Sequence, residues 1–88
     1  MTPPETAAAE RLWVRLRLAP EPDALARALG VVLVAQAGIR SVTYKSEPEC
    51  GWSVLDLDGL CPMRAASLKR RLQGLACVEE LQSLAADA

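Results

Sequence analysis

Hydrophobic and polar residues alternate along two segments of the chain. Residues 11–18 place an apolar side chain at every second position, and residues 50–58 largely repeat the pattern. Side chains of a β-strand point alternately to the two faces of a sheet, so both segments are predicted to be strands with one buried and one open face. The side chains expected on the buried face are Leu12, Val14, Leu16, Leu18, Ser53, Leu55 and Leu57, and those expected on the open face are Arg11, Trp13, Arg15, Arg17, Trp52, Val54, Asp56 and Asp58.

Two further strands are predicted from residue type. Residues 39–46 are rich in β-branched and aromatic side chains, and the Glu-Pro-Glu turn at 47–49 joins them to 50–58 as a hairpin. Residues 78–84 are predicted to form the last strand.

Helical periodicity fills the two remaining gaps. Apolar residues recur three and four apart over 22–37, and Pro22 suits the first turn of a helix. We expect Gly38 to end this helix. Glycine costs about 1 kcal/mol in a helix interior, so we interpret Gly30 as a point of close packing. A second helix is predicted over 62–73, again opened by a proline and closed by a glycine.

The predicted order is strand, helix, strand, strand, helix, strand. With right-handed crossovers this order gives an α+β fold, the ferredoxin-like βαββαβ plait, in which two helices cover one face of a four-stranded antiparallel sheet. The chain has 88 residues, which suits a single domain. We expect that domain to span residues 11–84, between disordered tails at 1–10 and 85–88.

Composition narrows the chemistry. The chain has no histidine, so the commonest general base and the commonest metal ligand are missing. The three cysteines, Cys50, Cys61 and Cys77, form no C-x-x-C pair, and we expect them to be reduced thiols in a cytoplasmic protein. We therefore predict a protein that is not an enzyme and has no metal site and no cofactor.

Charge argues against a nucleic-acid partner, and hydropathy argues against a secretory signal and a membrane span. The net charge is −1, whereas nucleic-acid-binding domains are usually basic. The start of the chain has no basic segment followed by an apolar one, so we expect no secretory signal. The longest apolar run, residues 31–35, is far shorter than the ~20 residues that a membrane span needs.

Residues 21–42 resemble the opening of an ACT domain. That family has the pattern Asp-x-Pro-Gly-x-Leu, then a helix of the type Ala-Arg-Val-Leu, then Gly-Ile-Asn-Ile-x-Ser-Val. Without gaps, the matching positions are Pro22, Leu25, Arg27, Leu29, Ile39, Ser41 and Val42. The spacing Leu-x3-Leu-x2-Leu-x2-Val over 68–78 is similar to the last helix and strand of the small regulatory subunits of acetohydroxyacid synthase. Together the resemblance covers residues 12–84.

The resemblance implies a regulatory module that forms a homodimer, modulates a large catalytic subunit of amino-acid metabolism, and binds a small amino acid between two copies. The helix N-terminus there offers unpaired amides to a carboxylate. Arg40 is the cation expected to take the ligand carboxylate. The implied ligand-facing positions are Pro20, Glu21, Pro22, Asp23, Ala24 and Leu25 and, from the neighbouring copy, Gly38, Ile39 and Arg40.

Two positions depart from the family pattern. Asp23 replaces the glycine that lets a ligand approach, and we expect its carboxylate to compete for the helix amides. Gly38 stands where the family has an asparagine, so a polar ligand contact is missing. Small subunits of branched-chain amino-acid synthesis can carry an acidic residue at the first of these positions and remain structural activators. These departures favour an assembly or activation role over amino-acid sensing.

The open sheet face carries two tryptophans and admits three interpretations. Arg15 and Arg17 are expected opposite Asp56 and Asp58, which would make a solvated charge ladder with tryptophan under arginine. In the second interpretation, Trp13, Trp52 and Val54 form an apolar interface between copies. In the third, Trp13 and Trp52 stack RNA bases, since RNA-recognition motifs share this topology; the two aspartates and the low pI argue against that alternative.

Residues 69–71, Lys-Arg-Arg, form the only basic cluster of the sequence, together with Arg64. One interpretation is a solvated helix face, and the other is a contact with an acidic patch on a partner subunit.

Overall fold

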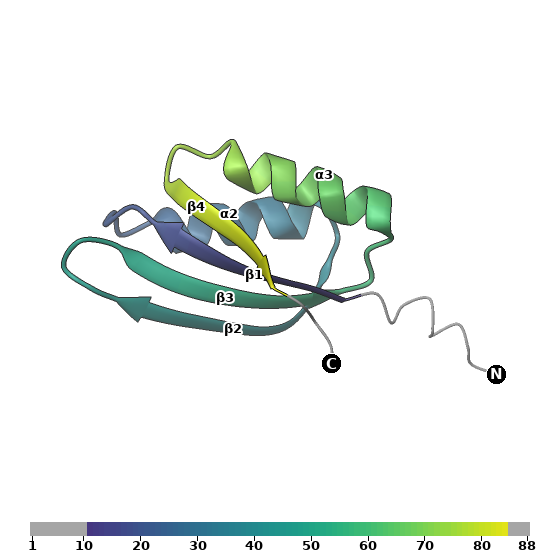
Figure 1. The fold of residues 1–88 in the computed structure, drawn as a ribbon, viewed down its shortest axis with the longest axis horizontal. Coiled ribbons are helices and arrows are strands. Elements are labelled where there is room, and N and C mark those ends of the chain that lie inside the picture. Colours follow the sequence, from purple (N-terminus) through teal and green to yellow (C-terminus); the bar gives the residue numbers. More distant parts are fainter. Residues whose placement is uncertain (1–10, 85–88) are drawn as a thin grey trace.

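The computed structural model describes residues 11–84, and the two predicted tails lie outside the described residues. Six elements follow in the predicted order (Figure 1). They are β1 (Arg11–Leu18), α2 (Ala24–Val34), β2 (Gly38–Ser46), β3 (Gly51–Asp58), α3 (Pro62–Gln73) and β4 (Val78–Leu84).

The four strands form one antiparallel sheet in the order β2-β3-β1-β4, and both helices lie on the same side of it (Figure 1). The predicted α+β fold, the ferredoxin-like plait, is therefore confirmed. The order leaves β2 and β4 as the two edge strands. Neither described helix is long and apolar enough to cross a membrane.

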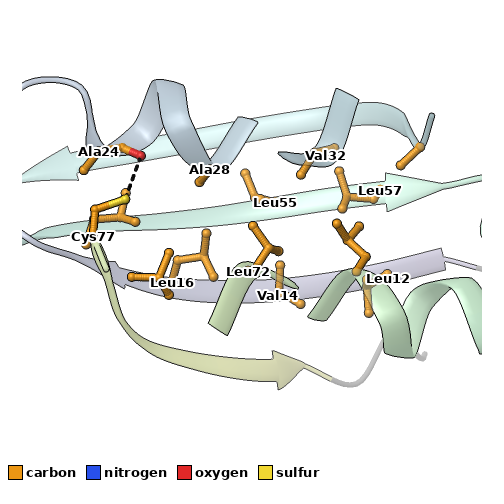
Figure 2. Packing of buried hydrophobic residues seen from close by; sticks show 14 of the residues in the cluster. Leu12, Val14, Leu16, Ala24, Ala28, Val32, Leu55, Leu57, Leu72 and Cys77 are labelled. Carbon is orange, nitrogen blue, oxygen red and sulfur yellow. Dashed lines mark hydrogen bonds between the residues drawn. The ribbon is translucent and has the colours of Figure 1, made fainter. Parts of the chain in front are cut away.

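The core lies between the sheet and the two helices (Figure 2). The alternating leucine and valine side chains of β1 are all buried, as predicted, and so are the apolar side chains of β3 on the same face. Ser53 is the polar member of that face, and its hydroxyl donates a hydrogen bond to the Thr43 carbonyl at 2.8 Å. The buried cluster comprises Leu12, Val14, Leu16, Leu18, Ala24, Ala28, Val32, Ala37, Leu55, Leu57, Leu60, Leu68, Leu72, Cys77 and Val78.

Helix α2 is shorter than predicted at both ends. It begins at Ala24 because the preceding residues form tight turns, in which the amide of Glu21 donates to the Ala19 carbonyl and the amide of Ala24 to the Glu21 carbonyl. At its other end Gln36, with φ of 61°, takes the left-handed conformation. The expectation that Gly38 ends the helix is therefore wrong, and that glycine is the first residue of β2.

Gly30 is not a point of close packing. A Cβ atom at this position would meet no atom within 4 Å, so the absent side chain leaves open space beside α2. Gly38 differs, because a Cβ there would collide with the carboxylate of Asp58. It is therefore Gly38 that permits a close approach.

Candidate functional site

The two halves of the implied ligand site lie far apart within one chain. Residues 20–25 form the turn before α2 and its first residues, whereas 38–40 begin β2 beyond its other end (Figure 1). A helix of 11 residues is about 16 Å long at 1.5 Å per residue. A single copy therefore does not bring the halves together.

Residues 20–25, the turn half of the implied ligand site, are mostly exposed, and the helix that follows them has no side-chain cap. Pro20, Glu21, Pro22 and Asp23 are exposed, Leu25 is half-buried, and the side chain of Ala24 is buried in the core. The Asp23 carboxylate makes no capping hydrogen bond to the helix amides. It lies instead 2.9 Å from Nε of Arg27, one turn along the helix. The expectation that Asp23 competes for the helix amides is wrong, because this arginine holds the carboxylate outside the helix end.

The strand half carries Arg40 beside two carboxylates. Its Nη1 atom lies 3.5 Å from Asp58 Oδ2, and its Nε atom lies 3.9 Å from Asp56 Oδ2. A bulge between Ile39 and Ser41 interrupts the pairing with β3 at this point. The side chain of Arg40 remains half exposed, at 51%. A ligand carboxylate that met Arg40 here would compete with carboxylates of the same chain.

The register of β1 against β3 differs from the predicted charge ladder. Trp13 is paired with Asp56, and Arg17 is paired with Trp52. The expected pairing of Arg15 and Arg17 with the two aspartates is therefore wrong. The antiparallel register carries these arginines toward the start of β3, whereas both aspartates lie near its end.

The carboxylates of β3 have other partners. Arg11 reaches Asp56 with two hydrogen bonds, the shorter of them 2.7 Å from Nη2 to Oδ2. Arg17 lies 3.2 Å from Glu79 of β4. The guanidinium of Arg15 lies over the Trp52 ring, 4.4 Å from its centroid.

The register distributes the three interface residues predicted on the open face over β1 and β3. Trp13, Trp52 and Val54 all lie on this face and are all half-buried. The register sets Trp52 four positions along β3 from the partner of Trp13, about 13 Å at 3.3 Å per residue. Arg15, paired with Val54, stands between the two tryptophans. Val54 and Arg15 both lie between the tryptophans, and the predicted apolar interface stays a prediction.

The free edge of β2 is a feature that the sequence analysis missed. Within residues 11–84, this nine-residue strand pairs with β3 on one side only. The amide of Glu47 donates to the carbonyl of Cys50 at 2.8 Å. Because antiparallel strands alternate between groups turned inward and outward, the backbone groups of Val42 and Tyr44 point away from β3. The topology alone makes β2 an edge strand, so the predicted element order already contained this signal.

Apolar side chains accompany this free edge. Ile39 is 39% exposed and Tyr44 is 46% exposed. On the neighbouring helix, Leu33 is 62% exposed. Edge strands of soluble monomers usually carry charges, prolines or bulges that block further pairing. Here the bulge and Arg40 lie near the start of the strand, and the regularly paired segment from Ser41 to Ser46 carries one charged side chain, Lys45.

The described cysteines and acidic residues do not gather into a site. Cys50 and Cys77 are buried thiols. The Cys77 thiol donates to the Ala24 carbonyl at 3.7 Å, an interaction drawn as a dashed line in Figure 2. Cys61 is an exposed thiol at the start of α3. No group of three or more Cys, Asp or Glu side chains within residues 11–84 is placed to hold a metal ion.

No family model and no curated protein matches the chain. Solved structures do match. The crystal structure of the ACT domain from GTP pyrophosphokinase of Chlorobium tepidum has a TM-score of 0.75 at 14% identity, over 84% of this chain and 96% of that one. The solution structure of the same domain gives 0.74 at 13% identity, over 86% of each chain. The C-terminal domain of the MgtC protein from Mycobacterium tuberculosis gives 0.70 at 14% identity, again over 86% of each. The chain thus has the fold of ACT domains.

Proposed function

We propose that this chain is a non-catalytic regulatory module that forms a homodimer through its sheet and modulates an enzyme of amino-acid metabolism. The observation that carries this proposal is the free edge of β2, in a chain that has the fold of ACT domains. The small regulatory subunits of acetohydroxyacid synthase, which the sequence resembles, are the model for this role. An assembly or activation role is favoured, because Asp23 and Gly38 depart from the family's ligand-binding pattern.

Edge pairing joins two sheets into one. Two copies of β2 placed antiparallel about Val42, the midpoint of the strand, would pair the outward backbone groups of one copy with those of the other. The exposed side chains of Ile39 and Tyr44 would be covered at the same time. Backbone pairing along an edge provides affinity, and the side chains beside it provide register.

The same pairing would set the two halves of the implied ligand site at one end of the joined sheet. About that midpoint, Gly38 of one copy lies opposite Ser46 of the second copy. Ser46 is paired with Gly51, which is paired in turn with Leu18, the last residue of β1. Residues 38–40 of one copy therefore lie at the same end of the joined sheet as the turn at 20–25 of the other, three strand spacings or about 14 Å away. This supports a site for a small amino acid between the copies, with Arg40 facing its carboxylate.

Sedimentation equilibrium tests the dimer. A proline at position 44 removes an outward amide, so Tyr44→Pro should yield a monomer with an unchanged circular dichroism spectrum. Tyr44→Ala is the matched control, because it removes the same ring but keeps the amide, and it should remain dimeric. A monomeric parent protein refutes the dimer. Dissociation by Trp13→Ser with Trp52→Ser, but not by Tyr44→Pro, would assign the contact to the open face.

Thermal unfolding with each of the twenty amino acids tests the ligand site. A ligand at 100 times its Kd adds about 2.7 kcal/mol to the free energy of unfolding. For a domain of this size that is a rise in Tm of more than about 10 °C. A rise with one chemical class, lost in Arg40→Ala, supports the amino-acid site. No rise with any of the twenty refutes ligand binding and leaves the assembly role to be tested by the dimer experiment.

A further inference from the structure

A groove runs between α2 and α3 on the side of the helices away from the core. Its floor is apolar and consists of Gly30, Val31, Val34 and Leu75. The groove is open to solvent, has a volume of about 530 Å³, and adjoins a second hollow of about 190 Å³ with which it shares Val34 and Arg71.

Gly30 keeps the floor of this groove low. A Cβ atom there would meet nothing within 4 Å, so the packing of this chain does not require glycine. Glycine in a helix interior costs about 0.5–1 kcal/mol relative to alanine. The glycine therefore preserves a cavity at the expense of helix stability. Beside it Val34 is 70% exposed, a large apolar surface left in contact with water.

The rim of the groove is cationic. Arg27 and Arg71 line the larger hollow, and Arg64 lines the smaller one. No acidic residue of the described part of the chain lines either hollow. The two helices together contain five basic residues and no acidic residue, in a chain whose net charge is −1.

Arg27 of this rim is paired with Asp23, and Arg64 donates a hydrogen bond to the Ala35 carbonyl at 2.7 Å, so Arg71 is the rim cation that differs from those of the sheet. On the open face Arg11, Arg17 and Arg40 each lie within 4 Å of a carboxylate. On α3, by contrast, Arg71 has no carboxylate within ion-pair distance among residues 11–84. Its neighbours Lys69 and Arg70 have none there either.

We propose that the groove between α2 and α3 binds an acidic amphipathic helix of a partner protein. The apolar side chains of such a helix would enter the hollow over Gly30 and Val34, and its carboxylates would meet Arg71 and Arg64. A recessed apolar floor with a basic rim complements one apolar stripe flanked by acidic residues. A nucleic acid fits less well, because neither helix carries an aromatic side chain on which bases could stack. A flat lipid surface would leave the hollow unfilled.

Fluorescence anisotropy with a designed probe tests this proposal on the full chain. The probe is a labelled peptide of about 15 residues, long enough to form a helix, with leucines spaced three and four apart and glutamates elsewhere. We expect saturable binding that is at least tenfold weaker for Arg71→Glu. The matched control is Arg70→Glu, an identical charge reversal at the preceding residue. Arg70 lines a different hollow, beside β4. The affinity of this variant should stay within about threefold of the parent.

A second variant tests the floor without changing charge. Gly30→Met fills the hollow and should also weaken binding at least tenfold, while the thermal transition shows that the protein is folded. The absence of saturable binding at millimolar peptide overturns the proposal. The proposal is also overturned if Arg71→Glu and Arg70→Glu weaken peptide binding equally, or if polyglutamate binds with the same affinity as the peptide. Tighter binding of the protein to phosphatidylglycerol vesicles or to single-stranded DNA than to the peptide overturns it as well. The test does not depend on the β2 dimer, because Tyr44→Pro should bind the peptide as the parent does.

Discussion

Replacing Gly30 by alanine should stabilise the protein, although glycine in the middle of a helix usually suggests tight packing. The added methyl group meets no atom within 4 Å, so it causes no collision. The residue lies in regular helix, where alanine is the more favourable residue by about 0.5–1 kcal/mol. A change of 1 kcal/mol shifts the Tm of a domain of 60–100 residues by roughly 4–8 °C. The expected rise in Tm for Gly30→Ala is therefore about 2–8 °C.

Thermal unfolding followed by circular dichroism measures this shift, and Gly59→Ala provides the contrasting control. Gly59 has φ of 77° in the turn after β3, a conformation that favours glycine, so alanine there should lower the Tm. If Gly30→Ala leaves the Tm unchanged or lowers it, the space beside Gly30 is filled, and the groove cannot take the side chains of a partner helix. If both variants raise the Tm, the substitutions act mainly by lowering the conformational entropy of the unfolded chain, and the Tm does not report the space around each glycine in the folded protein.

Three further outcomes follow from burial and charge. Leu16→Ala, at a fully buried position of the central strand β1, should cost about 2–5 kcal/mol in urea unfolding, whereas Leu33→Ala, at a position 62% exposed, should cost under about 1 kcal/mol. Asp56→Ala leaves Arg11 without its partner and should cost about 1–3 kcal/mol, whereas the more exposed Asp58→Ala should cost under about 1 kcal/mol; equal losses would contradict the assigned pairing. A thiol reagent should add one group, at Cys61, to the native protein and three to the unfolded chain, as counted by mass spectrometry.

The sequence contained most of the fold because its strands carry a strong local signal. The alternation through β1 assigns each side chain to a face without reference to any other element, and all four predicted buried positions from Leu12 to Leu18 are buried. Helix α3 begins at Pro62 and ends at Gln73, because a proline and a glycine limit it locally. Features of this kind depend only on neighbouring residues.

Features that depend on distant residues were predicted less well. The partner of Arg15 is set by the register between β1 and β3, which are far apart in sequence, and the predicted partner was wrong. The left-handed residue after α2 is Gln36 rather than Gly38. Gly38 lies instead in β2, where a Cβ atom would collide with the Asp58 carboxylate. From the sequence alone, Gly38 could either end the helix or allow a close approach to β2, and only the tertiary structure decides between these two roles. The groove was missed for the same reason, whereas the free edge of β2 already followed from the predicted element order.

Helix α2 lies between the two proposed contacts, the β2 edge and the groove beside α3. Its sequence is more apolar than its burial within one copy requires. It has one charged residue, Arg27, among 11, a composition typical of a helix covered on most sides. Only Ala24, Ala28 and Val32 are buried, and all three are small. Residues 29 and 31 lie on opposite flanks of a helix, and Val31 faces the groove beside α3. The other flank, ending at the exposed Leu33, therefore lies toward β2. A second copy on the β2 edge and a partner helix in the groove would together cover both flanks, which accounts for an apolar helix that the core alone leaves half uncovered.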